Sequence, residues 1–229
     1  MWTATILSLF PEMFPGTLGL SIAGKAMKNN IWSLKTVNIR DFSNDKNGKV
    51  DDVPFGGGAG MVIKADVIDK ALSSIIDAEG PRIYLSPRGK KFDQRFAKSL
   101  SEEKGAVFIC GRYEGVDERF LVHNDIIELS VGDFILSGGE LGAQIVLDAT
   151  IRLLPDVIGN SEGLIEESFE NNLLEYPLYT QPRVWKDRKV PEVLFSGDHK
   201  KIKDWKLKQA EKITKLKRPD LWSKYKNLN

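Results

Sequence analysis

Residues 106–115 read Ala-Val-Phe-Ile-Cys-Gly-Arg-Tyr-Glu-Gly, an apolar run that passes directly into glycine and polar side chains. A short apolar run that ends at glycine and polar residues is typical of a β-strand. Glycines after a strand end let backbone N–H and C=O groups approach a ligand closely. This stretch therefore predicts a strand followed by a loop that belongs to a binding site.

The same pattern recurs along the first 155 residues, where short apolar runs alternate with longer amphipathic ones. Strands interleaved with helices indicate a largely parallel sheet, so the predicted fold class is α/β. The predicted strands are Thr3–Leu9, Ser33–Asn38, Arg82–Leu85, Ala106–Cys110 and Ile126–Leu129. The predicted helices are Ser21–Asn29, Ala65–Asp77, Asp93–Leu100 and Gly139–Leu154, and the last is so apolar that we expect it to be buried.

An acidic, irregular stretch over residues 159–176 begins with Gly-Asn-Ser-Glu-Gly and predicts an interdomain linker. It would separate a domain of residues 1–158 from a second domain of residues 177–229. In the second domain, a helix is predicted to start near Asp198 or His199 and to end before Pro219. Its predicted packing face consists of side chains at helical spacing: Ile202, Trp205, Gln209, Ile213 and Leu216.

The net charge of +1 conceals a strong asymmetry. Residues 1–180 carry 18 Lys and Arg against 26 Asp and Glu, whereas residues 181–229 carry 15 against 6. A basic tail of this kind favours contact with a polyanion, because lysines and arginines near phosphates release condensed counterions. A solvated helical face explains the charges equally well, so charge alone leaves the choice open.

Cysteine and histidine are scarce in this chain. Cys110 is the only cysteine, and His123 and His199 are the only histidines, so a Cys/His zinc site and an internal disulfide are both excluded. The first residues lack a basic leader region, and no apolar run approaches the ~18 residues needed to span a bilayer. We therefore expect a cytoplasmic protein with no metal site and no membrane contact.

Glycine concentrates in three loops after predicted strands, at residues 56–60, 110–115 and 131–140. Each cluster alone is consistent with an ordinary turn, but open α/β sheets bind ligands beyond the carboxyl ends of their strands. Together the clusters predict one shared site for a small polar ligand. Standard nucleotide motifs do not fit, because Met61 and Val62 follow Gly60 and no strand precedes a G-x-G-x-x-G pattern.

Six ordered segments carry a family resemblance. They are residues 7–14 (Leu-Ser-Leu-Phe-Pro-Glu-Met-Phe), 40–42 (Arg-Asp-Phe), 50–58, 84–87 (Tyr-Leu-Ser-Pro), 110–119 and 138–141 (Gly-Gly-Glu-Leu). In order and spacing they resemble the bacterial tRNA (guanine-N1)-methyltransferases of the SPOUT superfamily, from Trp2 to about Trp222. The resemblance implies a parallel-sheet domain with a deep trefoil knot, followed by a small, mainly helical domain that binds tRNA.

The resemblance also implies that S-adenosylmethionine is held by three loops at the knot. Backbone groups of Gly111, Val131, Gly132, Phe134 and Leu136 would hydrogen-bond its adenine and ribose. The side chains of Pro87 and Leu136 would pack on the adenine, with plain core packing as the alternative. The implied cofactor-binding residues are Tyr84, Leu85, Ser86, Pro87, Gly111, Tyr113, Glu114, Val131, Gly132, Asp133, Phe134, Ile135, Leu136, Gly138 and Gly139.

The implied reaction is methylation of N1 of the guanosine 3′-adjacent to the anticodon. N1 carries a proton, so a carboxylate is needed as general base, and a cation near O6 would stabilise the charge that develops. By resemblance the base is Glu167 and the cation is Arg152. The family usually has Asp at the position of Glu167, and a shift of roughly an ångström can cost ~100-fold in rate, so either the loop compensates or a neighbour such as Glu166 shares the role.

Several assignments have alternatives. Arg152 is either the cation or a structural partner of Glu114 or Asp148. Glu114 lies either near the methionine end of the cofactor or in a salt bridge with Arg112 or Arg119.

The resemblance also implies a homodimer, in which each active site is completed by the partner's linker and C-terminal domain. The lysines of residues 200–217 would lie along the anticodon-stem phosphates. Leu178 and Gln181 stand where the family has polar and basic residues, which argues against phosphate contact there. Two other functions stay open: a SPOUT enzyme with a different RNA target, and a non-catalytic RNA-binding homologue.

Overall fold

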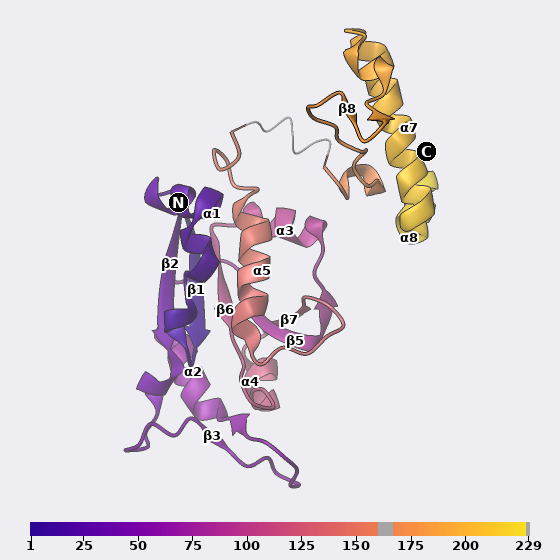
Figure 1. Cartoon of the computed structure of the whole chain (residues 1–229). Helices are drawn as coiled ribbons and strands as arrows, with labels where there is room; N and C mark the ends of the chain where they lie inside the picture. Colours follow the sequence, from indigo (N-terminus) through magenta and orange to yellow (C-terminus); the bar gives the residue numbers. More distant parts are fainter. Residues whose placement is uncertain (160–166, 228–229) are drawn as a thin grey trace. The chain divides into compact units, whose positions relative to one another are not determined.

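The structure, a computed structural model, describes residues 1–159 and 167–227. The chain divides into two compact units, Met1–Gly159 and Asn160–Asn229 (Figure 1). Each unit has secondary structure and buried side chains of its own. Residues 160–166, with the candidate base Glu166, lie outside the described residues.

A five-stranded parallel sheet forms the centre of the first unit, in the order β2–β1–β6–β5–β7. The predicted α/β class and parallel sheet are confirmed. The strands are β1 (Trp2–Ser8), β2 (Trp32–Asn38), β5 (Arg82–Lys91), β6 (Gly105–Ile109) and β7 (Ile127–Ser130). Two short strands, β3 (Asp51–Asp52) and β4 (Val62–Ile63), form a separate antiparallel pair.

Strand β5 is longer than predicted and is interrupted. The prediction ended it at Leu85, because Ser86 and Pro87 break the apolar run. In the structure the pairing of β5 with β7 shifts register between Leu85 and Lys90. Gly89 passes so close to β7 that a Cβ atom there would lie 2.3 Å from the backbone nitrogen of Leu129. The irregularity carries Ser86 and Pro87 to the wall of a cavity.

Helices cover both faces of the sheet and create two apolar cores. One core joins the sheet to α1 (Ser21–Lys28), α3 (Gln94–Ser101) and α5 (Gly139–Ile151). The other core joins it to α2 (Ala65–Ser73) and α4 (Glu118–His123). Neighbouring residues of β6 divide between them: Phe108 belongs to the first core and Val107 to the second. This alternation follows from the two-residue repeat of a strand.

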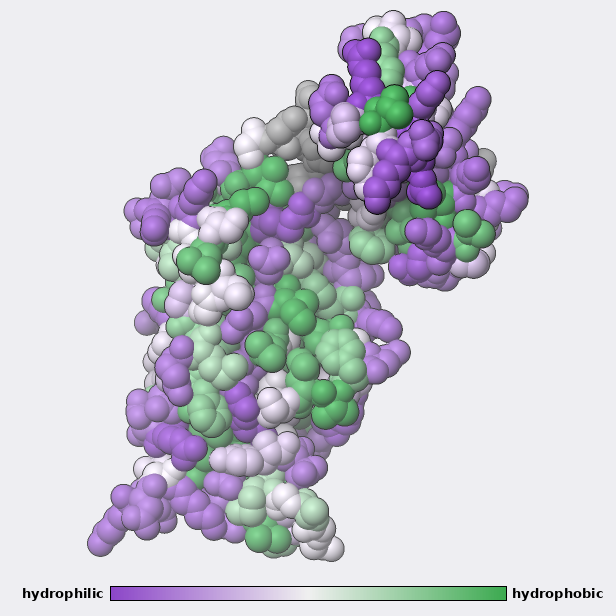
Figure 2. All heavy atoms as spheres, in the orientation of Figure 1, coloured by the Kyte–Doolittle hydropathy of each residue, from purple (hydrophilic) through white to green (hydrophobic). Residues whose placement is uncertain are grey.

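Helix α5 is buried on one face only. Ala143, Val146 and Leu147 are buried, whereas Leu141 and Ile145 are each 47% exposed. Figure 2 shows apolar side chains gathered on this face of the first unit. The prediction of a buried helix is therefore wrong for one of its faces, because the sheet covers only the opposite side.

The second unit contains α7 (His199–Lys217), α8 (Pro219–Lys226) and a hairpin of β8 (Val184–Trp185) and β9 (Arg188–Lys189). Helix α7 begins where predicted, because the Asp198 carboxylate accepts a hydrogen bond from the Lys201 backbone N–H at 3.1 Å. Leu216 was predicted on the packing face, but it is 76% exposed. Ala210 and Thr214 are buried instead.

The predicted linker is partly built into the second unit. The Leu174 backbone N–H donates to the Thr214 hydroxyl at 2.8 Å, and Leu173 is buried. From Glu167 onward, the described part of residues 159–176 therefore packs with the second unit. The remaining short helical turns are 3-10 segments: Pro11–Met13, Gly16–Gly19, Ile39–Phe42, Glu170–Asn172 and Glu192–Phe195.

Candidate active site

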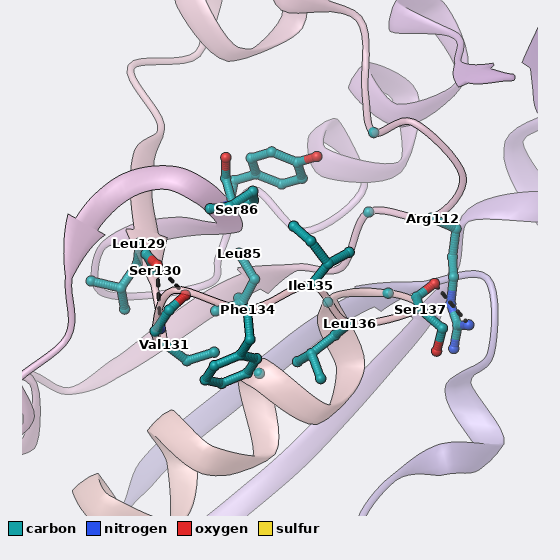
Figure 3. A pocket seen from close by; sticks show the side chains of 18 of the residues that line it. Leu85, Ser86, Arg112, Leu129, Ser130, Val131, Phe134, Ile135, Leu136 and Ser137 are labelled. Atoms are coloured by element: carbon teal, nitrogen blue, oxygen red, sulfur yellow. Dashed lines mark hydrogen bonds between the residues drawn. The ribbon is translucent and has the colours of Figure 1, made fainter. Parts of the chain in front are cut away.

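A cavity of about 250 Å³ lies at the carboxyl ends of the sheet strands (Figure 3). Three segments surround it: the excursion of β5, the loop after β6, and the loop that joins β7 to α5. This is the edge at which open parallel sheets bind ligands. Of the fifteen residues implied for the cofactor, all except Asp133 line this one cavity. The chain thus brings together residues up to 55 positions apart, from Tyr84 to Gly139.

Asp133 is the exception. Its side chain is 90% exposed, and its carboxylate pairs with the Lys91 ammonium at 3.3 Å. It belongs to the loop over the cavity but does not line the cavity. A direct contact from its carboxylate to a bound ligand is not supported by this arrangement.

Two glycines allow the loops to approach each other. A Cβ atom on Gly139 would lie 2.9 Å from the Cα of Cys110, and one on Gly111 would lie 2.7 Å from the Tyr84 hydroxyl. The Gly139 N–H donates to the Gly111 carbonyl at 3.0 Å. The loop after β6 is therefore pinned to the first residue of α5, with no room for side chains between them.

The cavity combines apolar walls with backbone polar groups. Pro87 is exposed and Leu136 is half-buried, and both line the cavity, so neither serves as a core residue. Within residues 1–159 and 167–227, the backbone groups of Phe134–Leu136 take part in no hydrogen bond. Backbone donors and acceptors next to apolar walls suit a flat heteroaromatic ring with polar edges.

Glu114 lies at the rim and lines both this cavity and an adjoining one. Two arginines were its possible salt-bridge partners, but each has another carboxylate. Arg112 lies 2.9 Å from Glu140, and Arg119 lies 2.7 Å from Asp117. Glu114 is exposed, and Gly60 leaves room for its carboxylate. This places a negative charge where a cationic ligand group would be stabilised.

Two titratable groups near the cavity depart from their usual ranges. Burial raises the pKa of Tyr84, so its hydroxyl stays protonated at neutral pH. The hydrogen bond from Arg119 lowers the pKa of Asp117, which therefore stays ionised. Tyr84 can thus serve the site as a neutral wall and hydrogen-bonding group, but not as a base.

Arg152 lies at the far end of α5 from the cavity. It caps the carboxyl end of the helix, whereas Gly139 begins it. Thirteen helical residues, with a rise of ~1.5 Å each, place ~20 Å between the two positions. There Arg152 lines a different cavity together with Asp148, Leu20 and Ile22. Within one chain, Arg152 is not brought to the glycine-lined cavity.

Glu167 belongs to the second unit. It is half-buried and lines a cavity with Tyr176, Lys203 and Lys206. The Lys206 ammonium lies over the Tyr176 ring, 4.6 Å from its centroid. The two residues implied for the chemistry therefore stand on different units.

Three residues that line the glycine-rich cavity lie outside the loops singled out from the sequence: Leu129, Ser130 and Gly142. Leu129 and Gly142 fall within a strand and a helix, where periodicity assigns them to the core. Arg112, Gly115 and Ser137 lie inside the predicted glycine-rich loops, although no individual role was assigned to them.

Across residues 1–159 and 167–227, no helix combines the length and the apolar character needed to cross a bilayer. In those same ranges, no three or more His, Cys, Asp and Glu side chains gather as a set of metal ligands.

Comparison with known proteins identifies the family of this chain. Residues 1–224 match the family described as tRNA (Guanine-1)-methyltransferase TrmD. A protein of Pelagibacter ubique named tRNA (guanine-N(1)-)-methyltransferase is 58% identical over 227 residues, which is 99% of each chain. Proteins of the same name from Rhodospirillum rubrum and Bartonella tribocorum are each 53% identical over 222 residues, covering 97% of this chain and 93% and 95% of theirs. Matches of this length and identity show that the chain belongs to the tRNA (guanine-N1)-methyltransferase family.

Proposed function

We propose that this protein transfers a methyl group from S-adenosylmethionine to N1 of the guanosine 3′-adjacent to the anticodon of tRNA. The observation that carries this proposal is the single cavity lined by Tyr84–Pro87, Gly111–Glu114 and the loop before α5. The relatives described above are named tRNA (guanine-N(1)-)-methyltransferases, which supports methyl transfer to guanine N1 of a tRNA. A cytoplasmic location, where tRNA is modified, belongs to the same proposal.

The cavity residues fit S-adenosylmethionine, which would supply an activated methyl group on its sulfonium. Pro87 and Leu136 offer apolar contact for the adenine ring. The backbone groups of Phe134–Leu136, which have no hydrogen-bond partner among the described residues, offer hydrogen bonds to its edge and to the ribose. Glu114 at the rim would favour the cationic methionine end. The trefoil knot implied by the resemblance is part of this proposal, supported by the β6–β5–β7 order and the crowding of the three loops.

Two charged residues would perform the proton chemistry. Methyl transfer is an in-line displacement, so the protein must hold N1 opposite the sulfonium and remove its proton. Glu167 would accept that proton, and Arg152 would stabilise the negative charge that spreads to O6. These two assignments rest on the family resemblance.

A homodimer would complete the site. Arg152 lies ~20 Å along α5 from the cavity of its own chain. The face of α5 between them is apolar and exposed through Leu141 and Ile145, and exposed Leu20 and Ile22 also lie in the first unit. A two-fold axis crossing α5 would cover this face and bring Arg152 of one chain to the glycine-rich cavity of the other. One arrangement would thus bury the patch and bring Arg152 to the cavity.

The basic helix α7 would bind the anticodon stem. Its lysines project into solvent: Lys200, Lys201, Lys203, Lys208, Lys212, Lys215 and Lys217 are all exposed. Such lysines contact phosphates without reading the sequence, so they would position the RNA. The choice of target base would then belong to the active site.

The triple substitution Lys208→Gln, Lys212→Gln and Lys215→Gln is expected to weaken tRNA binding. Each lost phosphate contact should also reduce the slope of log affinity against log salt by about 0.7–0.9. Titration of labelled tRNA at several salt concentrations measures both effects. A matched triple substitution of exposed lysines in the first unit, Lys28, Lys70 and Lys98, should leave the slope unchanged. Equal slopes for both triple variants would contradict the assignment of α7.

Transfer of labelled methyl from S-adenosylmethionine to a tRNA transcript tests the proposed function. The expected product is N1-methylguanosine next to the anticodon, and a transcript with adenosine at that position should receive no label. Methylation at another nucleotide or on a ribose would favour a SPOUT enzyme with a different target. Cofactor binding without transfer would favour the non-catalytic RNA-binding homologue.

A further inference from the structure

A buried ion pair adjoins the glycine-rich cavity, with Arg112 in the cavity lining and Glu140 outside it. Arg112 Nε is 2.9 Å from Glu140 Oε2, and the Glu140 side chain is only 1% exposed. The other carboxylate oxygen, Oε1, accepts a hydrogen bond from the Ser8 hydroxyl at 2.6 Å. Among the described residues, Arg112 Nε and Glu140 Oε2 attract each other as an ion pair without hydrogen-bond geometry, and the hydrogen bond that the carboxylate needs in this buried place comes from Ser8. The pair therefore holds its surroundings to one geometry.

Arg112 makes further contacts with the same guanidinium. It donates to the Ser137 carbonyl at 3.3 Å, as the dashed line in Figure 3 shows. It also lies over the Phe10 ring, 4.4 Å from the centroid, and within 3.2 Å of the Met13 sulfur. A planar fork of donors can make these contacts together, whereas the compact ammonium of a lysine cannot.

These contacts join three segments that are distant in sequence. Ser8 ends β1, Arg112 follows β6, and Ser137 to Glu140 lead into α5. Gly138 lies between the charged groups so tightly that a Cβ atom there would be 2.4 Å from Arg112 Nε and 2.6 Å from Glu140 Oε2. Backbone pairing of Arg112 with Gly138 adds a second link. The carboxyl end of the loop over the cavity is thus anchored at one point.

The rest of that loop has few bonds of its own. Within the described chain, the backbone groups of Phe134–Leu136 make no hydrogen bond, and Phe134 and Ile135 are exposed. The position of these groups over the cavity therefore depends on the anchored end at Ser137. If the ion pair is lost, the loop keeps the Gly139–Gly111 backbone hydrogen bond at one end and the exposed Lys91–Asp133 ion pair at the other, and these leave the segment Phe134–Leu136 between them unsupported.

We propose that Arg112 and Glu140 are positioning residues for methyl-donor binding, because their ion pair holds the loop before α5 in the conformation that receives the adenosine. The proposal rests on the proposed function only in taking the cavity as the S-adenosylmethionine site. Glu140 does not line the cavity and acts through Arg112, which in turn holds Ser137.

The test measures affinity for S-adenosylhomocysteine by calorimetry, which requires no turnover, together with unfolding by denaturant. Arg112→Met leaves a buried, unpaired carboxylate and should lower both stability and affinity. Combining it with Glu140→Gln removes that charge while keeping an acceptor for Ser8. The double variant should regain stability, yet its dissociation constant should remain raised by about tenfold or more, the order seen when groups that orient a binding residue are removed.

Arg112→Lys provides a second route to the same answer. It keeps the charge beside Glu140 and should fold, but it cannot hold Ser137 at the same time, so the dissociation constant should rise here as well. The matched control is Arg218→Met with Asp220→Asn, which removes an ion pair of 2.6 Å in the second unit and should leave binding unchanged.

The outcomes separate the two proposals. Wild-type stability combined with wild-type affinity, in the double variant or in Arg112→Lys, would show that the pair is merely structural and would overturn the inference. If the double variant does not fold, Arg112→Lys decides. Failure of the wild-type protein to bind S-adenosylhomocysteine would instead count against the cavity assignment in the proposed function.

Discussion

Replacement of Glu167 by glutamine is expected to lower methyl-transfer turnover by ~10²–10⁴-fold, the usual contribution of a general base. Glutamine has nearly the same shape but cannot accept the N1 proton. Affinity for S-adenosylhomocysteine should not change, because Glu167 belongs to the second unit and does not line the glycine-rich cavity. Single-turnover transfer of labelled methyl, with calorimetry of the same preparations, measures both quantities.

Two companion variants sharpen this result. Glu175→Gln is the matched control, because Glu175 lines the same cavity as Glu167 and has the same charge. It should retain transfer. Glu167→Asp restores the residue usual in the family and should also retain transfer. Undiminished activity of Glu167→Gln would move the base elsewhere, and the same substitution at Glu166 would then be the next measurement.

Mixing two inactive variants is expected to restore activity if the site is shared between chains. Leu136→Trp fills the cofactor cavity of one chain, and Glu167→Gln removes the base of the other. In a mixed dimer, the open cavity of the Glu167→Gln chain would meet the intact Glu167 of its partner. Random mixing makes half of the dimers mixed, each with one working site, so about a quarter of wild-type activity should return.

The controls for this experiment follow from the geometry. Each variant alone should be inactive, and mixing either with itself should restore nothing. If cavity and base instead act within one chain, every site in the mixed dimer carries one defect and no activity returns. Leu141→Lys on the exposed face of α5 should abolish the recovery as well, because it places a charge in the proposed interface.

Much of the fold was readable from local sequence pattern. The five sheet strands and helix α7 follow from apolar periodicity and from a capping aspartate, Asp198, which act over a few residues. The errors occur where distant segments decide. Strand β5 continues past Pro87 because β7 lies beside it, and Leu216 is exposed because the partners of α7 pack against Ala210 and Thr214 instead.

Some residues of the candidate site could be predicted from the sequence, whereas others depend on the tertiary structure. The glycine clusters and the motif resemblance identified fourteen of the residues that line the cavity. A position where two backbones approach closely requires glycine, so such a position can be recognised from the sequence. The pairing of Arg112 with Glu140 could not be predicted in this way, because the two residues are 28 positions apart in the sequence and meet only after folding. The same applies to Asp133, whose exposure depends on how the loop turns.

The sequence by itself determined the α/β class, the basic second unit and the family, because these depend on residue type and order along the chain. Only the tertiary structure decided which loop residues face the cavity, that one face of α5 stays apolar and exposed, and that Arg152 lies ~20 Å along that helix from the cavity it is expected to serve. The reason is physical: local propensity acts over a few residues, whereas burial, ion pairing and distance are set by segments that meet only after folding.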